Sequence, residues 1–223
     1  MKRVSIPPLY QHYFTDKSDE RRMLFSIIEE RYHPRKGLYP GSFVHITPSF
    51  FIQDMTYIDA DRRISKFFTD QNVQKYIDEN KTYRENALVH WFQADYESEL
   101  PIEEESFDVL FSLYAGFISQ SCKKYLKENG ILVCNNSHGD ASIAYLDYEY
   151  IFAGVIKRQG EKFTIIDSKL DEYFRKKDGR PIDKKKVLNS MKGENFSRKG
   201  YAYIFRYCSK PVSSSLAGSN QVN

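Results

Sequence analysis

Short apolar runs alternate with segments of helical periodicity over residues 36–136. The apolar runs predict strands that end near Pro40 and that cover residues 55–58, 88–93, 109–113 and 131–135. Helices are expected at 16–32, before the first strand, and at about 62–79 and 118–127, with Gly130 ending the last of them. This alternation predicts an α/β fold with a mostly parallel sheet.

The pattern changes after residue 136. A helix at 141–146 is followed by two strands at 150–158 and 163–167, joined as a hairpin through Gly160, and by a last strand at 200–207. We expect residues 1–208 to form a single domain, in which 1–35 are a helical lead-in. The polar stretch 209–223 is expected to be disordered.

The composition is typical of a globular protein with one domain and no membrane span. A chain of 223 residues suits one α/β domain, and 41% hydrophobic with 28% charged residues is typical of a soluble globular protein. No apolar run approaches the roughly 20 residues needed to span a bilayer, so no membrane contact is expected. The three cysteines form no Cys-x-x-Cys pair, which favours reduced thiols and a cytoplasmic location.

Three candidate site residues each follow a predicted strand, at the edge where an open parallel sheet leaves a crevice. Gly41 permits a sharp turn and close approach of a ligand. Asp59 offers a carboxylate that suits a ribose diol, and Asp95 follows the next strand. The structural alternatives are an ordinary turn glycine, a helix cap at Asp59 or Asp61, and a loop aspartate that binds local amides. We assign Asp59 to the diol and Asp61 to the cap.

The run from Leu88 to Asn136 carries a family resemblance. Asp95 is followed by Leu100-Pro101, by acidic residues, and by Ser106-Phe107-Asp108 at the start of a strand. In this it resembles the class I S-adenosylmethionine-dependent methyltransferases, over roughly residues 36–136. The resemblance implies a Rossmann-like three-layer α/β/α sandwich, a mostly parallel sheet with an antiparallel C-terminal strand at 201–207, and S-adenosylmethionine as cofactor.

The resemblance also implies roles for single residues. Gly41 would lie in the cofactor loop, Asp59 would bind ribose, Asp95 would face the adenine amino group, and Tyr96 would flank the ring. Of the family's acidic residue and Gly-x-Gly, only Pro40-Gly41-Ser42 is present, with Tyr39 where the acid often stands. Ser112, with Leu113 and Tyr114, would form another wall of the pocket. The Gly-x-Gly-x-x-Gly loop of nicotinamide dehydrogenases is absent, which disfavours that class.

Candidate chemistry follows the fifth strand, in the polar run 135–140. His138 is a candidate general base and Asp140 its orienting partner. The alternative is a polar turn in which Ser137 or Asp140 caps the next helix. The chain lacks both the Asn/Asp-Pro-Pro-aromatic motif of DNA amino-methyltransferases and the Pro-Cys pair used for cytosine ring methylation, which favours a small-molecule acceptor.

Residues 169–199 hold eleven Lys or Arg against five acids. Such a segment can contact a phosphate backbone, although lysine runs usually form a solvated face. No histidine spacing suggests a metal site. Two alternatives to a small-molecule methyltransferase therefore stay open, namely a non-catalytic methyltransferase-like binding module and a nucleic-acid-modifying methyltransferase that uses residues 169–199.

Overall fold

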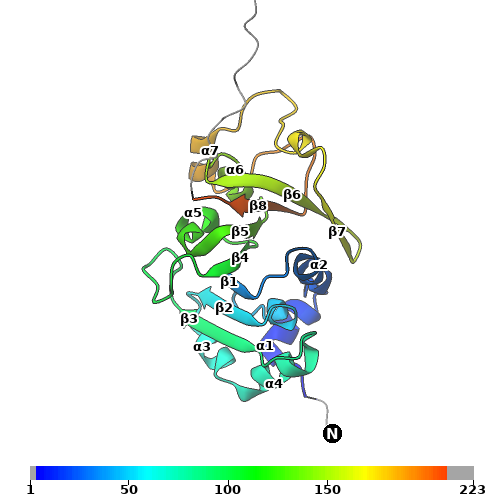
Figure 1. Cartoon of the computed structure of the whole chain (residues 1–223), viewed down its shortest axis with the longest axis vertical. Coiled ribbons are helices and arrows are strands. Elements are labelled where there is room, and N and C mark those ends of the chain that lie inside the picture. Colours follow the sequence, from blue (N-terminus) through cyan, green and yellow to red (C-terminus); the bar gives the residue numbers. More distant parts are fainter. Residues whose placement is uncertain (1–3, 210–223) are drawn as a thin grey trace, which may run out of the picture.

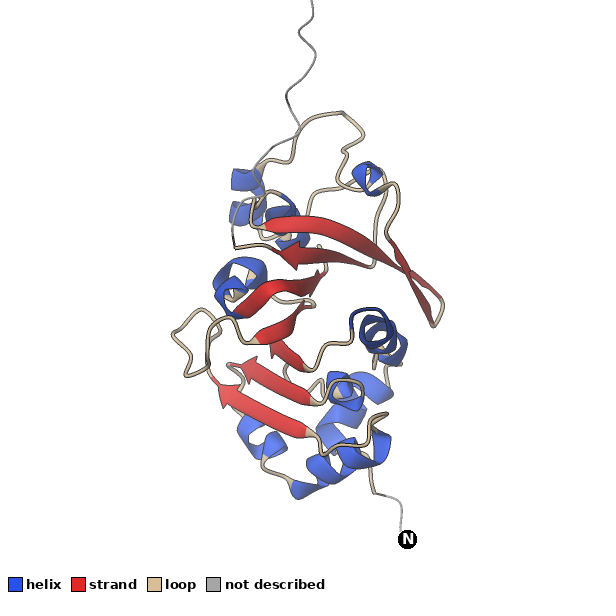
Figure 2. Cartoon of the chain, viewed as in Figure 1, coloured by secondary structure: helices blue, strands red, loops and turns tan. Residues whose placement is uncertain are grey.

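The computed structural model describes residues 4–209, and this part of the chain forms one mixed sheet (Figures 1 and 2). The strand order is β3-β2-β1-β4-β5-β8-β6-β7. The strands are β1 (Lys36–Pro40), β2 (Asp54–Asp59), β3 (Leu88–Gln93), β4 (Phe107–Ser112), β5 (Leu126–Cys134), β6 (Tyr150–Gln159), β7 (Lys162–Ile166) and β8 (Ala202–Tyr207).

The first five strands run parallel, and the sequence order reverses between β1 and β4. Strand β8 is inserted antiparallel between β5 and β6, with Cys134 opposite Tyr203. The hairpin of β6 and β7 completes the edge. The sheet therefore confirms the predicted α/β class, the mostly parallel arrangement and the antiparallel C-terminal strand.

Helices cover both faces of the sheet, and α2 and α5 lie on opposite sides of it (Figure 1). The helical segments are α1 (Pro8–Tyr10), η1 (Gln11–Thr15), α2 (Arg22–Tyr32), η2 (Thr47–Phe50), α3 (Arg63–Phe68), α4 (Gln71–Asn80), α5 (Ile118–Ser121), η3 (Lys123–Tyr125), α6 (Asp140–Tyr145), η4 (Leu170–Glu172) and α7 (Lys184–Ser190). Among these described helices, none has the length and apolar character to cross a membrane.

Alternate side chains of the central strands pack into apolar clusters on the two faces of the sheet. In β4, Leu110 packs with the α5 and α6 side, whereas Val109 and Phe111 pack with the α2 side. Strand β5 alternates in the same way, because successive side chains of a strand point to opposite faces. A third cluster under α3 and α4 includes Tyr10 of the lead-in. Continuous apolar strands such as β4 are thus explained by burial on both sides.

Several predicted helix bounds differ from the structure. The lead-in at 8–15 is helical, and α2 begins only at Arg22 because Arg21 adopts a left-handed conformation with φ of 55°. The predicted helix at 62–79 is divided into α3 and α4. Asp70 caps α4, since its carboxylate accepts a hydrogen bond from the Asn72 amide.

The role predicted for Gly130 is wrong. The helix after β4 ends at Ser121, and β5 already begins at Leu126 and continues through Gly130. A Cβ on Gly130 would lie 2.9 Å from the Lys127 carbonyl oxygen, next to a register shift between β4 and β5. Gly130 therefore serves a bulge in a strand. Apart from Ser209, the predicted disordered tail lies outside the described residues.

Candidate functional site

Gly41 lies directly after β1, in the left-handed region with φ of 65°. Its amide donates a hydrogen bond to the Ile58 carbonyl oxygen of β2 at 2.8 Å. A Cβ on Gly41 would lie only 2.7 Å from the Cβ of Ala115, in the loop after β4. Glycine is therefore required both by the backbone conformation and by the close approach of the loop after β4.

Asp59 ends β2 beside this loop. One carboxylate oxygen accepts the Phe43 amide at 2.8 Å and the other accepts the Asp61 amide at 2.9 Å. These two bonds fix the carboxylate while leaving each oxygen a further lone pair. The side chain thus has a defined orientation between the ends of β1 and β2.

Asp61 has a different role. Its carboxylate accepts the backbone amide of Arg63 at 2.8 Å and the guanidinium of the same residue at 2.7 Å. The hydrogen bonds from Arg63 lower the pKa of Asp61 to about 2. Asp61 therefore binds Arg63, the first residue of α3, while the assignment of Asp59 to a diol stays a prediction.

Asp95 and Tyr96 lie in the loop after β3. Asp95 is exposed, and its carboxylate accepts the amide of Glu97 at 2.9 Å. The Tyr96 hydroxyl lies 2.7 Å from where a Cβ of Gly116 would be, so this ring packs on the loop after β4. Burial raises the pKa of Tyr96. The structure brings Tyr96 and the loop after β4 together, while Asp95 points to solvent.

Tyr39 of β1 is turned into the core. Its hydroxyl lies 3.1 Å from Nδ1 of His45, whose Nε2 lies 3.1 Å from the Glu20 carbonyl oxygen. Because a carbonyl only accepts, Nε2 carries the proton and Nδ1 accepts from the tyrosine. Burial raises the pKa of Tyr39 to about 12 and lowers that of His45. The residue at the position of the family's acid is therefore a neutral core tyrosine.

Ser112 and Asp140 form a buried pair. The Ser112 hydroxyl donates to the Asp140 carboxylate at 2.5 Å, and the Ser119 amide of α5 donates to the same carboxylate at 3.1 Å. Burial raises the pKa of Asp140 to about 6, against the lowering effect of these hydrogen bonds. His138 instead has Ser137 as its partner, at 3.0 Å from Nδ1. The structure thus brings Asp140 to Ser112 and α5, and not to His138 as the sequence suggests.

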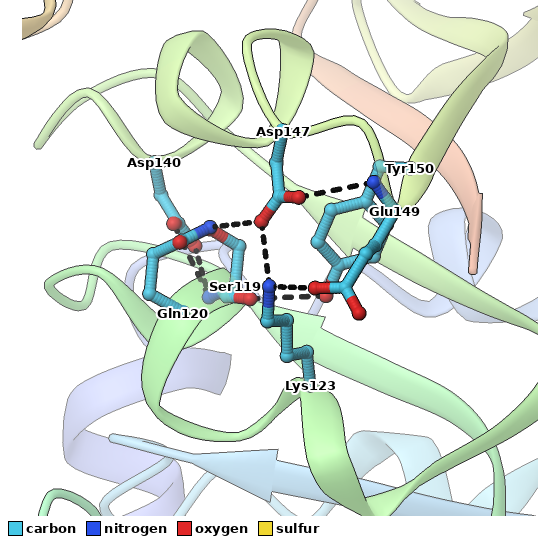
Figure 3. Close-up of polar contacts among 7 residues, drawn as sticks. All are labelled: Ser119, Gln120, Lys123, Asp140, Asp147, Glu149 and Tyr150. Atoms are coloured by element: carbon cyan, nitrogen blue, oxygen red, sulfur yellow. Dashed lines mark hydrogen bonds and ion pairs between the residues drawn. The ribbon is translucent and has the colours of Figure 1, made fainter. Parts of the chain in front are cut away.

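Asp140 belongs to a polar network that joins α5 to the start of β6 (Figure 3). Lys123 pairs with Asp147 at 2.9 Å and also with Glu149. Gln120 donates to Asp147 at 3.1 Å, and the Tyr150 hydroxyl donates to the Ser119 carbonyl oxygen at 3.0 Å. These contacts hold α5 and α6 together on one face of the sheet. Because the loop after β4 leads into α5, they also help to position that loop.

A cavity of about 240 Å³ opens at the carboxyl ends of β4 and β5. Tyr114 and the run 135–137 form one wall, as the sequence suggests, and residues 193–203 form the other. Asn135 is 5% exposed; its Oδ1 accepts from the amide and hydroxyl of Ser137, and its Nδ2 is a buried atom without a partner among the described residues. The wall of the cavity therefore contains a buried, unsatisfied donor.

Sequence reasoning missed the second wall of this cavity. Strand β8 runs antiparallel to β5, so the chain that enters β8 must pass the carboxyl end of β5. This brings Lys199, Gly200 and Tyr201 beside Asn135 and Asn136. The predicted antiparallel strand at 201–207 could have indicated this wall, because the residues that enter such a strand lie at the carboxyl end of its parallel neighbour. In the described residues, no group of His, Cys, Asp and Glu is suited to hold a metal ion.

The strand order, the inserted antiparallel strand and the loop at Gly41 give this chain the Rossmann-like fold of the class I S-adenosylmethionine-dependent methyltransferases. No family model matches the chain, and no curated protein matches its sequence. Solved structures do match. The YcgJ protein of Bacillus subtilis is 21% identical, with a TM-score of 0.40 over 57% of this chain and 55% of that protein. The chain thus spans about half of that protein's length.

Two further matches are described as methyltransferases. One, from Geobacter sulfurreducens, is 12% identical with a TM-score of 0.45, over 70% of this chain and 86% of that one. The other, the N-methyltransferase NodS of Bradyrhizobium japonicum in complex with S-adenosyl-L-homocysteine, is 11% identical with a TM-score of 0.44, over 92% and 93%. These values are low, so neither a cofactor nor a substrate of this chain follows from them.

Proposed function

We propose that this chain is a methyltransferase that uses S-adenosylmethionine and acts on a small molecule. The observation that carries the proposal is the pairing of Gly41, in left-handed conformation after β1, with the Asp59 carboxylate fixed after β2. Ligands of open parallel sheets bind at the carboxyl ends of the strands where the order reverses. These two residues occupy that position with groups suited to close approach and to a ribose diol.

The residues around Gly41 suit a polar ligand. Ser42 is buried, and its hydroxyl has no partner among the described residues. Asp59 retains lone pairs for two diol hydroxyls after accepting the two amides. A bound sulfonium cofactor would supply an electrophilic methyl group. The chain's own part is then to orient the acceptor, for which the cavity at Asn135 lies at the adjoining strand ends.

One observation favours a second candidate, a methyltransferase-like binding module without catalysis. Ala115 packs against Gly41, and Tyr39 stands in the core where the family often has an acid. If the loop after β4 stays closed on Gly41, the cofactor has no room. The two candidates therefore differ in whether the crevice accepts a ligand.

Calorimetric titration with S-adenosylmethionine and S-adenosylhomocysteine separates the candidates, with NAD as the negative control. The test variant is Asp59→Asn, which keeps the shape and one acceptor oxygen but loses the charge. The matched control is Asp61→Asn, two positions away and committed to Arg63. We expect binding to the sulfur compounds that weakens at least tenfold in Asp59→Asn alone. A folded wild-type protein that binds neither compound would refute the methyltransferase proposal in favour of the module.

A further inference from the structure

The basic segment docks on the end of β5. A Cβ on Gly193 would lie 2.0 Å from the carbonyl oxygen of Asn136, so the two backbones are in close contact. Gly139 has φ of 93°, and a Cβ there would lie 2.4 Å from the side chain of Val187 in α7. Two glycines thus anchor α7 and the chain after it against the turn that follows β5. The backbone of this segment is therefore held beside the Asn135 cavity.

A groove of about 1300 Å³ follows this segment and adjoins the cavity. The groove and the Asn135 cavity share residues 193–196 and Lys199 as a common wall. The groove and the cavity are therefore direct neighbours. Lys199 lies at the junction, where its Nζ donates to the side-chain oxygen of Asn195 at 2.9 Å.

The groove carries an excess of positive charge. Its cations outnumber its acids by six to three. Glu194 pairs with Lys176 at 3.1 Å and with Lys186 at 4.0 Å, and Arg180 pairs with Asp178. The other three cations form no ion pair within residues 4–209: Lys177, Lys192 and Lys199. The groove therefore offers three ammonium groups to a ligand.

Asn135 supplies the neutral donor at the inner end. Its orientation is fixed because Oδ1 must face the Ser137 amide, which can only donate. Nδ2 is then left as a buried donor with no partner in the described part of the chain. A buried donor without a partner is destabilising, and an oxygen of a ligand that reaches it would satisfy it.

We propose that the groove and the Asn135 cavity together bind the acceptor substrate, a small molecule with a phosphate or carboxylate group that the three lysines hold while an oxygen of the molecule accepts from Asn135. The assignment of this ligand as the methyl acceptor rests on the proposed function; the binding site itself does not. The bound molecule would lie across the ends of β4 and β5, next to the loop that covers Gly41.

A small anion suits the site better than a nucleic acid. Proteins that follow a phosphate backbone neutralise about six to ten phosphates, whereas three unpaired lysines match one phosphate or two carboxylates. The inner cavity of about 240 Å³ admits only a small group. Lys184 and Lys185, which lie in the same basic run, are exposed and do not line the groove. These two charges therefore lie outside the proposed site.

The test uses the full chain and nuclear magnetic resonance titration with phenyl phosphate, with phenol as the neutral counterpart. The side-chain amide signal of Asn135, assigned by its loss in Asn135→Asp, reports the inner end. The doubly substituted Lys192→Gln/Lys199→Gln protein removes two exposed charges that the fold does not need, and Lys185→Gln is the matched control. We expect phenyl phosphate to shift the Asn135 signal, with affinity about tenfold weaker in the double variant and unchanged in Lys185→Gln.

Three outcomes would overturn the proposal. The first is absence of phenyl phosphate binding, and the second is equal binding of phenol. The third is salt-dependent binding of a single-stranded oligonucleotide that Lys185→Gln weakens as much as Lys192→Gln/Lys199→Gln, which would identify the basic segment as a nucleic-acid surface. The phenyl phosphate titration contains no cofactor, so its outcome does not depend on whether the protein binds S-adenosylmethionine. Either proposal can therefore be refuted without the other.

Discussion

Two regions at the carboxyl ends of the strands differ in how their polar groups are satisfied. In the crevice after β1, β2 and β3, the carboxylates of Asp59 and Asp95 accept amides from their own or neighbouring loops. In the cavity after β4 and β5, Asn135 keeps a buried donor free and three nearby lysines have no ion pair in the described structure. The carboxylates of the first region are thus already fixed by backbone amides, whereas the lysines of the second are left for the ligand that we propose.

The difference shows what local sequence and topology each contribute. Asp59 and its amide partners lie within 18 positions of one another, so a motif read along the chain finds the crevice. The walls of the cavity come from Tyr114 with residues 135–137, and from residues between 193 and 203, which the inserted strand β8 brings together. The following predictions test whether the two regions act separately.

The largest effects are expected from Gly41→Ala and Gly193→Ala, each of which places a methyl group against a close backbone or side chain. We expect either change to lower the free energy of unfolding by about 2–3 kcal/mol. Gly41→Ala should remove S-adenosylhomocysteine binding and spare phenyl phosphate binding, and Gly193→Ala should do the reverse. Urea unfolding and the two titrations measure this.

The control for both glycine variants is Gly160→Ala. Gly160 has φ of 62° but no atom within 4 Å of its Cβ position, so only the backbone strain of about 1–2 kcal/mol applies and neither ligand should be affected. Loss of both ligands in each of the two site variants would show that the crevice and the cavity are one cooperative site.

Asp140, on the buried side of both regions, should show the next largest effect. Asp140→Ala leaves the Ser112 hydroxyl and the Ser119 amide unpaired and should cost about 2–3 kcal/mol. Asp140→Asn can replace both bonds, because its oxygen accepts from Ser119 and its amide donates to Ser112. At neutral pH the asparagine variant should therefore be at least as stable as the wild type.

Ionisation of the buried Asp140 is expected to destabilise the fold as the pH rises. Burial raises the pKa of Asp140 from 3.8 to about 6, so the folded protein binds this proton more tightly than the unfolded chain. Its contribution to stability is complete below pH 4 and is lost as the pH rises through 6, by about 3 kcal/mol. The stability difference between Asp140→Asn and the wild type should grow over that interval in urea titrations. Parallel pH profiles would contradict an ionising, buried Asp140.

The sequence predicted β4 and the second half of β5 because burial on both faces leaves a clear apolar pattern in these strands. The edge strand at 88–93, which has no buried residue, was also predicted, and the antiparallel strand at 201–207 was expected from the family resemblance. Helix bounds were less accurate, since Arg21 and Asp70 interrupt apolar patterns by backbone conformation and capping. Gly130 was misassigned because a glycine in a strand bulge and a glycine after a helix look alike in sequence.

The candidate site was predictable only where its residues are close in sequence. Asp59, Asp61 and the polar run 135–140 were named from local patterns. The structure places all of them after strand ends, and residues 135–137 of the run line the cavity. The pairing of His138 with Asp140 was not found, because Asp140 is drawn under the strands by Ser112 and by the start of α5. Lys192 and Lys199 were part of a basic run, but only the structure shows that both line the groove and that Lys199 also lines the cavity.

Lys123, in the network beneath the cavity, should have a smaller effect. Lys123→Met removes the cation from Asp147 and Glu149 and should cost about 1–2 kcal/mol at neutral pH. Burial alone would raise the pKa of Asp147, but the hydrogen bond from Lys123 and its other partners lower it. A carboxyl group whose pKa is lowered in the folded state stabilises the fold at pH values above its ordinary pKa. This contribution is lost as the pH falls through the lowered pKa.

The loss in Lys123→Met should therefore be seen in thermal or urea unfolding at pH 7 and shrink toward pH 3. The matched control is Lys124→Met at the next position, whose exposed pair with Glu104 should contribute less than the pairs of Lys123. Equal losses in the two variants, or a loss that persists in acid, would show that the network does not depend on charge.

The smallest effect is expected at Asp95, and it sharpens the contrast between the two regions. The resemblance assigns this residue to the adenine amino group, whereas its carboxylate accepts only the Glu97 amide in the contacts described. Asp95→Asn keeps an acceptor for that amide, so stability should change by less than about 0.5 kcal/mol. If the adenine contact forms, S-adenosylhomocysteine binding should weaken about threefold to tenfold by calorimetry, because a carboxylate accepts more strongly than an amide. Unchanged affinity would make Asp95 a turn residue, and ligand recognition in the crevice would then rest on Asp59 and the Gly41 loop.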